Sequence, residues 1–179
     1  MSYDGNTKTD NPQKTFNKDY FKDYVSVPTF TVKFDFKANL KTGYAFFQGL
    51  KKITKIKFTG FKEATLEAMN FMFDGCEMLQ SVDFGTLNTG HVNSFYALFQ
   101  DCISLTSLDL RGLDTSQVTM MSDMFHGDTA LKSIDVSTWD TRSVTQMEDV
   151  FRNIEAVGYW AGAIRINGKI EAIAIGGRL

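Results

Sequence analysis

The sequence predicts an α/β solenoid, which is a stack of repeated units that each contain one strand and one short helix. A phenylalanine recurs every 26 residues, and a fixed period of this length is typical of stacked-repeat folds. Its positions are Phe21, Phe47, Phe73, Phe99, Phe125 and Phe151. One unit cannot bury its apolar face alone, so about five neighbouring units are expected to cover one another.

Three further apolar columns keep the same period and predict the strand of each unit. They lie six, nine and eleven residues after the phenylalanine and spell the L-x-x-L-x-L pattern of leucine-rich repeats. Leu105, Leu108 and Leu110 form one of the best copies. Residues two apart on a strand face the same way, so the last two columns should point into one core.

A second apolar rhythm predicts a short helix after each strand. Apolar residues follow one another there at intervals of three and four, as they do along one face of a helix. The three clearest sets are Val92, Phe95, Leu98 and Phe99; Val118, Met121, Met124 and Phe125; and Val144, Met147, Val150 and Phe151. Asp114-Thr115-Ser116 and Asp140-Thr141 precede two of these sets, and we expect them to cap the helices.

The combined pattern resembles a known repeat family. Leu-x-Ser-Leu-Asp-Leu, followed by Asp-Thr-Ser-x-Val-Thr-x-Met and by Met-Phe-x-x-Cys, is similar to the BspA-type leucine-rich repeat of bacterial surface proteins. The resemblance covers residues 71–151 closely and 20–70 loosely. It implies a right-handed solenoid that serves in adhesion or protein binding.

The periodicity divides the chain into four segments. They are a polar tail over 1–14, an N-terminal cap with a degenerate first repeat over 15–44, leucine-rich repeats over 45–157, and a C-terminal β-hairpin cap over 158–179. Aromatic spacing predicts a helix over 16–24, and alternation predicts a strand over 29–37. Asn167-Gly168 between two β-rich runs predicts the hairpin.

Composition excludes several classes of function. The net charge of −2 gives no electrostatic footprint for nucleic acid, and no apolar run approaches the length of a membrane span. Residues 1–5 lack the features of a signal peptide, which favours the cytoplasm. The family resemblance instead implies a cell-surface or secreted protein, so both locations stay open. Neither the oligomeric state nor the identity of a partner follows from the sequence.

The residue inventory argues against an enzyme, and we expect no catalytic, cofactor-binding or metal-binding residues. His91 and His126 fall in different columns and do not align with the cysteines. Cys76 and Cys102 share one column of neighbouring units, where a disulfide is feasible. Free thiols are favoured, because other residues fill that column elsewhere. Residues 162–176 also resemble the central hairpin of acyltransferases of the acetyltransferase-like fold, but over this short segment only.

One set of outward strand positions is a candidate binding surface. Its members are Ser81, Asp83, Ser107, Asp109, Arg111, Ser133 and Asp135. In one interpretation each aspartate accepts local hydrogen bonds from neighbouring serines or from the backbone. In the other, the set forms a flat polar docking face for a protein partner. The outer side of the predicted helices, with Tyr96, Gln100, His126 and Arg152, is a second candidate surface.

The function predicted from these observations is non-catalytic binding of another protein. The resemblance favours a bacterial surface or adhesion module. The alternative is an intracellular binder, made by a phage or mobile element, that inhibits a host protein or nucleoprotein complex by occluding it.

Overall fold

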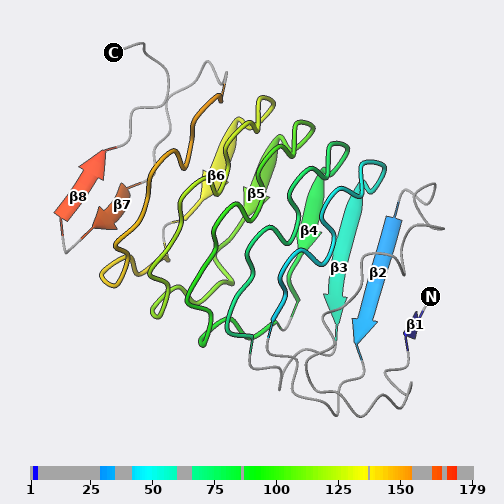
Figure 1. The fold of residues 1–179 in the computed structure, drawn as a ribbon, viewed down its shortest axis with the longest axis horizontal. Coiled ribbons are helices and arrows are strands. Elements are labelled where there is room, and N and C mark those ends of the chain that lie inside the picture. Colours follow the sequence, from blue (N-terminus) through cyan, green and yellow to red (C-terminus); the bar gives the residue numbers. More distant parts are fainter. Residues whose placement is uncertain are drawn as a thin grey trace.

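The structure is a computed structural model that describes residues 2–3, 29–34, 42–59, 66–85, 87–136, 138–154, 163–166 and 169–172. Within these residues the chain winds into a row of similar rungs, a rung being one 26-residue repeat as it folds (Figure 1). The regular elements of the described residues are eight short strands. They are β1 (Ser2–Tyr3), β2 (Thr29–Phe34), β3 (Lys55–Thr59), β4 (Ser81–Asp83), β5 (Ser107–Asp109), β6 (Ser133–Asp135), β7 (Ala163–Ile166) and β8 (Lys169–Ala172).

The strands pair from one rung to the next. Strands β1 to β4 form one parallel sheet in chain order, and β5 pairs with β6 in parallel. Lys55 lies opposite Ser81, and Ser107 lies opposite Ser133, so partners are 26 residues apart. The sequence period therefore sets the register. Strand β1 falls in the segment expected as a polar tail, and it pairs with β2.

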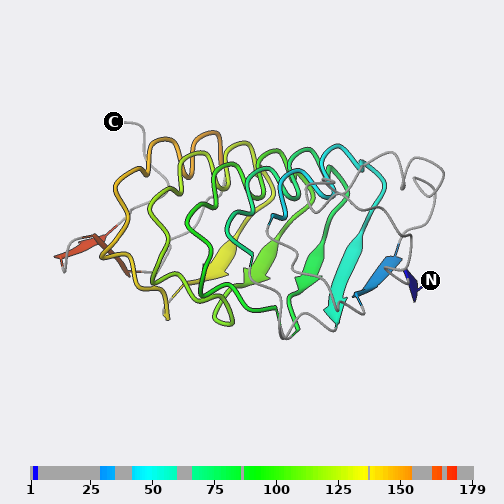
Figure 2. The same cartoon turned by 60° about the horizontal axis from the view of Figure 1, so that its bottom comes forward.

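The predicted α/β class is wrong, because the residues that the structure describes contain no helix. The segments 92–99, 118–125 and 144–151, expected as helices, consist of linked turns and single bridge residues. Figure 2 shows the linked turns along the upper side of the molecule and the strands along its lower side. The N-terminal helix expected over 16–24 lies outside the described residues.

Backbone hydrogen bonds explain why these segments are not helical. Alternate N–H groups donate to a carbonyl of the next rung, as Phe99 N does to Met124 O at 2.9 Å. The N–H groups between them donate three residues back, as Leu98 N does to Phe95 O at 3.2 Å. An α-helix needs each N–H bonded four residues back. Linked turns of this kind still point apolar side chains inward every three or four residues, which is why they resemble helices in sequence.

Left-handed residues interrupt each turn segment at two fixed places. The first place is occupied by Ala45, Phe71, Ala97, Asp123 and Asp149, and the second by Gly49, Gly75, Asp101, Gly127 and Asn153. All ten residues have φ between 51° and 80°. This conformation ends a right-handed helical path and costs a non-glycine residue about 1–2 kcal/mol. Bonds to the neighbouring rungs offset that cost.

The predicted C-terminal hairpin and the predicted strand over 29–37 are both confirmed in their described parts. Strands β7 and β8 pair antiparallel, with Ala163 opposite Ala172 and Ile166 opposite Lys169. Strand β2 covers the first six residues of the strand expected over 29–37.

The core is a line of phenylalanine rings that runs through the stack. Phe47, Phe73, Phe99 and Phe125 are fully buried, and Phe151 packs partly buried against them. Successive rings stack almost parallel, with centroids 5.0 Å apart for Phe73 and Phe99 and 5.7 Å apart for Phe99 and Phe125. The 26-residue period therefore places one ring over the next, which buries apolar area that a single rung would expose.

Candidate functional site

The predicted docking face is the outer face of the sheet, and its carboxylates have local partners. Asp83 lies opposite Lys57 in the register, and its Oδ2 is 2.7 Å from Lys57 Nζ. Its Oδ1 accepts a hydrogen bond from Gly85 N at 2.9 Å. The hydrogen bond from Lys57, and then that from Gly85, lower the pKa of Asp83. The carboxylate of Asp83 is thus ionised, and the ammonium group of Lys57 balances its charge.

Asp109 repeats this arrangement one rung further on. Its Oδ1 accepts from Arg111 N at 3.1 Å, and Arg111 Nη2 is 2.6 Å from its Oδ2. These bonds from Arg111 lower the pKa of Asp109 to about 2. The interpretation in which each aspartate accepts local backbone hydrogen bonds is therefore confirmed for Asp83 and Asp109. Ser81 and Ser107 are exposed on the same strands.

Strand β6 places Ser133 and Asp135 opposite Ser107 and Asp109 in the parallel register. The predicted set thus lies on three successive rungs, with β4 in the four-stranded sheet and β5 and β6 in a two-stranded one. The side chains of Ser133 and Asp135 lie outside the described part of the structure. Figure 1 shows β4 and β5 side by side in the row of strands.

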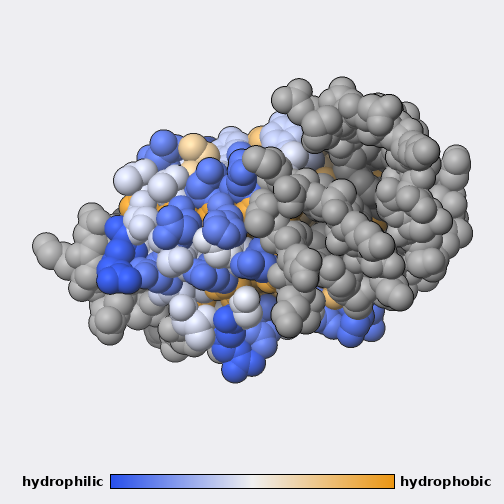
Figure 3. Space-filling model, turned by 90° about the horizontal axis from the view of Figure 1, so that it is seen from below, coloured by the Kyte–Doolittle hydropathy of each residue, from blue (hydrophilic) through white to orange (hydrophobic). Residues whose placement is uncertain are grey.

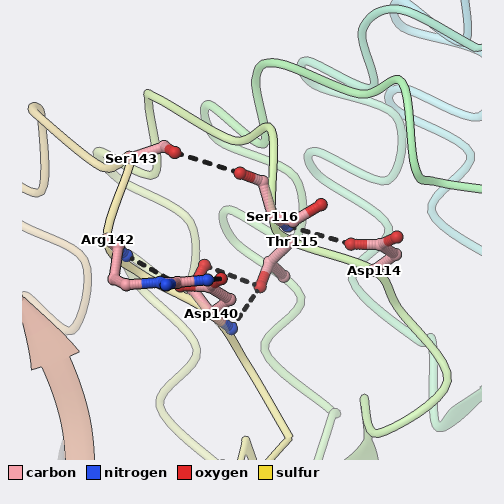
Figure 4. A network of polar contacts seen from close by, with 6 residues as sticks. All are labelled: Asp114, Thr115, Ser116, Asp140, Arg142 and Ser143. Atoms are coloured by element: carbon pink, nitrogen blue, oxygen red, sulfur yellow. Dashed lines mark hydrogen bonds and ion pairs between the residues drawn. The ribbon is translucent and has the colours of Figure 1, made fainter.

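A second polar region lies where the chain leaves the strands. Thr115 Oγ1 donates to Asp140 O at 3.0 Å and accepts from Asp140 N at 2.8 Å (Figure 4). Asp140 in turn accepts from Arg142 N and pairs with Arg142 Nη2 at 2.6 Å, which lowers the pKa of Asp140 to about 2. The carboxylate of Asp114 likewise accepts from Ser116 N at 2.9 Å.

The expectation that these residues cap helices is therefore wrong, because the capping geometry closes turns instead. The edge of the molecule seen in Figure 3 presents a mostly hydrophilic described surface. The bonds between Thr115 and Asp140 join neighbouring rungs, whereas those between Asp114 and Ser116 and between Asp140 and Arg142 close turns within one rung.

The turn segments present a different surface, here called the turn face. Three aromatic side chains, Tyr44, Phe71 and Tyr96, make edge-to-face contacts across successive rungs there. Ring centroids are 5.7 Å apart for Tyr44 and Phe71 and 5.0 Å apart for Phe71 and Tyr96. Tyr44 is 51% exposed, and Phe71 and Tyr96 are half-buried. We call these three residues the aromatic row.

Carboxylates lie next to this row. Burial raises the pKa of Tyr96, and the charge of Asp123, a hydrogen bond to Asp123 and the charge of Asp74 raise it further. Desolvation raises the pKa of Asp74, against the lowering effect of a 2.8 Å hydrogen bond from Gln48, and the charge of Asp101 raises it further. Two carboxylates, Asp123 and Asp74, therefore lie near the Tyr96 hydroxyl, and Asp101 lies near Asp74.

His126 is part of this surface and contacts two other side chains. Its Nδ1 lies 3.1 Å from Asp123 Oδ1, and its Nε2 lies 3.0 Å from Asn153 Nδ2. Because an amide nitrogen can only donate, Nε2 accepts and Nδ1–H donates to Asp123. The side chain that contacts Asp123 here is therefore a histidine, not a lysine or an arginine.

Buried protic groups form one column through the stack. Cys76 and Cys102 are free thiols, as predicted, and both are fully buried. Each Sγ–H donates to a carbonyl of the preceding rung, Cys76 to Phe47 O at 3.1 Å and Cys102 to Phe73 O at 3.2 Å. Burial raises the pKa of Cys76 to about 12 and that of Cys102 far above its usual range. Neither thiol is a ready nucleophile.

The described ranges contain no group of three histidine, cysteine or acidic side chains placed to hold a metal ion. No helix within them is long and apolar enough to cross a bilayer.

Sequence reasoning did not find the aromatic row. Tyr44 and Tyr96 share one column two repeats apart, but Phe71 lies in the next column and Asn70 fills theirs. A search along single columns therefore passes over the row. The one indication of the row in the sequence is that Tyr44 and Tyr96 lie two repeat periods apart.

Comparison with known proteins gives one family. The family described as Mycoplasma protein of unknown function, DUF285, matches residues 41–160, which is more than half of the 179-residue chain. No curated protein and no solved structure matches the sequence.

Proposed function

This chain belongs to DUF285, the family described as Mycoplasma protein of unknown function, and we propose that it is a non-catalytic module that binds another protein. The observation that carries this proposal is the aromatic row on the turn face. Tyrosine and phenylalanine are enriched in protein interfaces and supply much of their binding energy. In a monomer, Tyr44 at 51% exposure would leave apolar surface in water.

The rungs hold this row in place. Phe71 N donates to Tyr96 O at 3.0 Å, and Ala45 N donates to Asn70 O at 3.0 Å, so the backbone on both sides of each ring is bonded to the next rung. Little conformational entropy is then lost when a partner contacts the rings, and a smaller ordering cost leaves more of the contact energy for binding.

The sheet face supports the same function in a lesser role. Its predicted docking residues include Asp83 and Asp109, and both carboxylates are satisfied within the chain. Exposed ion pairs of this kind contribute little energy, but they set which partner surfaces are tolerated. We propose that the sheet face gives specificity and that the aromatic row gives affinity.

The biological setting follows from the resemblance to BspA-type repeats, which favours a bacterial surface or adhesion module. An intracellular inhibitor that occludes a host protein or nucleoprotein complex would use the same surface. The two settings differ in where the partner is found, so one experiment separates them.

The experiment is comparative capture with matched variants. The immobilised chain is exposed in parallel to host extracellular-matrix proteins and to bacterial lysate, and the retained proteins are identified by mass spectrometry. Tyr44→Ser/Tyr96→Ser removes two rings of the row. Met78→Ser/Ile103→Ser is the control, because it removes two other exposed apolar side chains, 49% and 44% exposed.

We expect a defined protein to be retained by the unaltered chain and by the control and to be lost from the tyrosine variant. Its source, matrix or lysate, decides between adhesion and inhibition. Equal retention by all three chains, or retention of nothing by the unaltered chain, contradicts the proposal.

A further inference from the structure

In the described part of the chain, Asp74 and Asp123 beside the aromatic row pair with no lysine or arginine. Elsewhere in that part, Asp83, Asp109 and Asp140 each pair with a lysine or arginine within 2.7 Å. Asp74 accepts a hydrogen bond only from the neutral amide of Gln48, and Asp123 contacts His126. Asp74 and Asp123 therefore differ from the paired carboxylates of the sheet face, and also from Asp149, which pairs with Arg152 at 3.0 Å.

The arrangement is also repulsive within itself. The charge of Asp101 acts on Asp74, so these two carboxylates repel each other, whereas the Tyr96 hydroxyl is neutral and hydrogen-bonds to Asp123. Like charges held close together gain from a cation that they can share. Each edge-to-face contact covers one face of one ring, and Tyr44 is still 51% exposed; a cation is attracted to an exposed ring face.

We propose that the aromatic row binds an arginine-rich extended segment of the partner protein, with Asp74 and Asp123 pairing with its guanidinium groups. This inference rests on the proposed function and names the chemistry of the partner. Arginine fits better than lysine, because a planar guanidinium can stack on a ring and pair with a carboxylate at the same time, and because it is less strongly hydrated than an ammonium.

The dimensions fit such a segment. Three rings on successive rungs span about 10 Å, because neighbouring rungs are about 4.8 Å apart. Three residues of an extended chain cover roughly the same length. One arginine can thus reach Phe71 and Asp74. A second arginine, two or three residues away, can at the same time reach Tyr96 and Asp123.

The probe is a fluorescein-labelled peptide of sequence Arg-Gly-Ser-Arg-Gly-Ser-Arg, titrated with the full chain and followed by fluorescence anisotropy. Peptides with lysine or glutamate in place of arginine are compared at the same ionic strength. We expect the arginine peptide to bind at least fivefold more tightly than the lysine peptide, and the glutamate peptide to show no saturable binding. Equal binding of the arginine and lysine peptides overturns the proposal.

A pair of charge-matched variants locates the site. Asp74→Asn/Asp123→Asn should weaken binding of the arginine peptide at least tenfold. Asp83→Asn/Asp109→Asn removes the same formal charge from the sheet face and should change binding less than twofold. If both variants weaken binding equally, the interaction is general electrostatics and the inference is wrong.

A measurement on the unaltered chain keeps the test independent of folding defects. In an NMR titration with the arginine peptide, the largest amide shifts should fall around Phe71, Asp74, Tyr96 and Asp123, not on β4 and β5. Shifts centred on the strands overturn the inference. If the captured natural partner is lost with the tyrosine variant but kept with Asp74→Asn/Asp123→Asn, only the arginine-rich partner is excluded and the proposed function stands.

Discussion

Thr115 holds Asp140 of the next rung through a single hydroxyl group, which donates to Asp140 O at 3.0 Å and accepts from Asp140 N at 2.8 Å. Thr89 holds Asp114 in the same way, with 3.0 Å and 2.7 Å. Thr89 and Thr115 are both buried. The threonine ladder therefore satisfies, inside the protein, backbone groups that neither strands nor turns reach.

Replacing Thr115 by valine should destabilise the protein by about 1–3 kcal/mol, because the shape is kept while the half-buried N and O of Asp140 lose their partner. Urea unfolding followed by circular dichroism measures this change. Thr119→Val is the control, since the Thr119 hydroxyl also bonds to a neighbouring rung but is exposed, and it should cost less than about 0.5 kcal/mol. Equal losses of unfolding free energy at the two positions would show that the buried threonine hydroxyl stabilises the protein no more than an exposed one.

Asp128 fills the column of Cys76 and Cys102 and makes stability depend on pH. Its Oδ1 accepts from Cys102 N at 2.7 Å, while Oδ2 is buried without a partner. Burial raises the pKa of Asp128 from 3.8 to about 9, and the charge of Asp101 adds to this. The carboxyl group is thus a neutral acid at pH 7, in a column where its neighbours are protonated thiols.

The sign of the effect follows from proton binding. Between pH 4 and pH 9 the folded chain keeps a proton on Asp128 that the unfolded chain has lost, so raising the pH favours unfolding. The free energy of unfolding should fall by up to about 1.4 kcal/mol per pH unit in this window. Below pH 4 the trend reverses, because Asp109 and Asp140, whose pKa values are lowered to about 2, are charged when folded at a pH where the unfolded chain is partly protonated.

The variant Asp128→Asn tests this assignment, because an amide has the shape of the neutral acid and does not titrate. Urea unfolding at pH 5, 7 and 9 should show a falling stability for the unaltered chain and a smaller slope for the variant. Other titrating groups are common to both chains and cancel in the difference. Parallel pH profiles would mean that Asp128 is ionised in the folded protein.

Gly85 has to be glycine for two independent reasons. Its φ is +54°, and a Cβ atom placed there would lie 2.3 Å from the carbonyl oxygen of Phe58. Gly85→Ala should therefore cost more than about 1–2 kcal/mol, since backbone strain adds to a clash that only a backbone shift can relieve. At Gly112 a Cβ meets nothing within 4 Å, so Gly112→Ala should leave the urea midpoint nearly unchanged. A tolerated Gly85→Ala would contradict the rung geometry at this turn.

The sequence period predicts strands β3 to β6 and their register, because a 26-residue repeat places Ser107 over Ser133 whatever joins them. It does not predict the turn segments. Intervals of three and four residues are shared by helices and by linked turns, and left-handed residues such as Ala45 and Ala97 carry no signal when they are not glycine. The local hydrogen bonds of Asp83 and Asp109 could be predicted from the sequence. An aspartate at the end of a strand commonly accepts a hydrogen bond from the backbone N–H two residues later. The two carboxylates near Tyr96 could not be predicted in this way, because Asp74 and Asp123 come from different columns of the repeat.

The phenylalanine line should show the largest single-residue effect on stability, with a gradient along the stack. Phe99 is fully buried and stacks on Phe73 at 5.0 Å and on Phe125 at 5.7 Å, so Phe99→Ala removes ring contacts on both sides and leaves a cavity. Such a truncation typically costs about 3–5 kcal/mol. Phe151 stacks on Phe125 at 5.6 Å and is half-buried, so Phe151→Ala should cost clearly less in the same urea titration. Equal losses of unfolding free energy at the two positions would contradict this gradient. They would mean that the stack unfolds from its terminal rung and not as one cooperative unit.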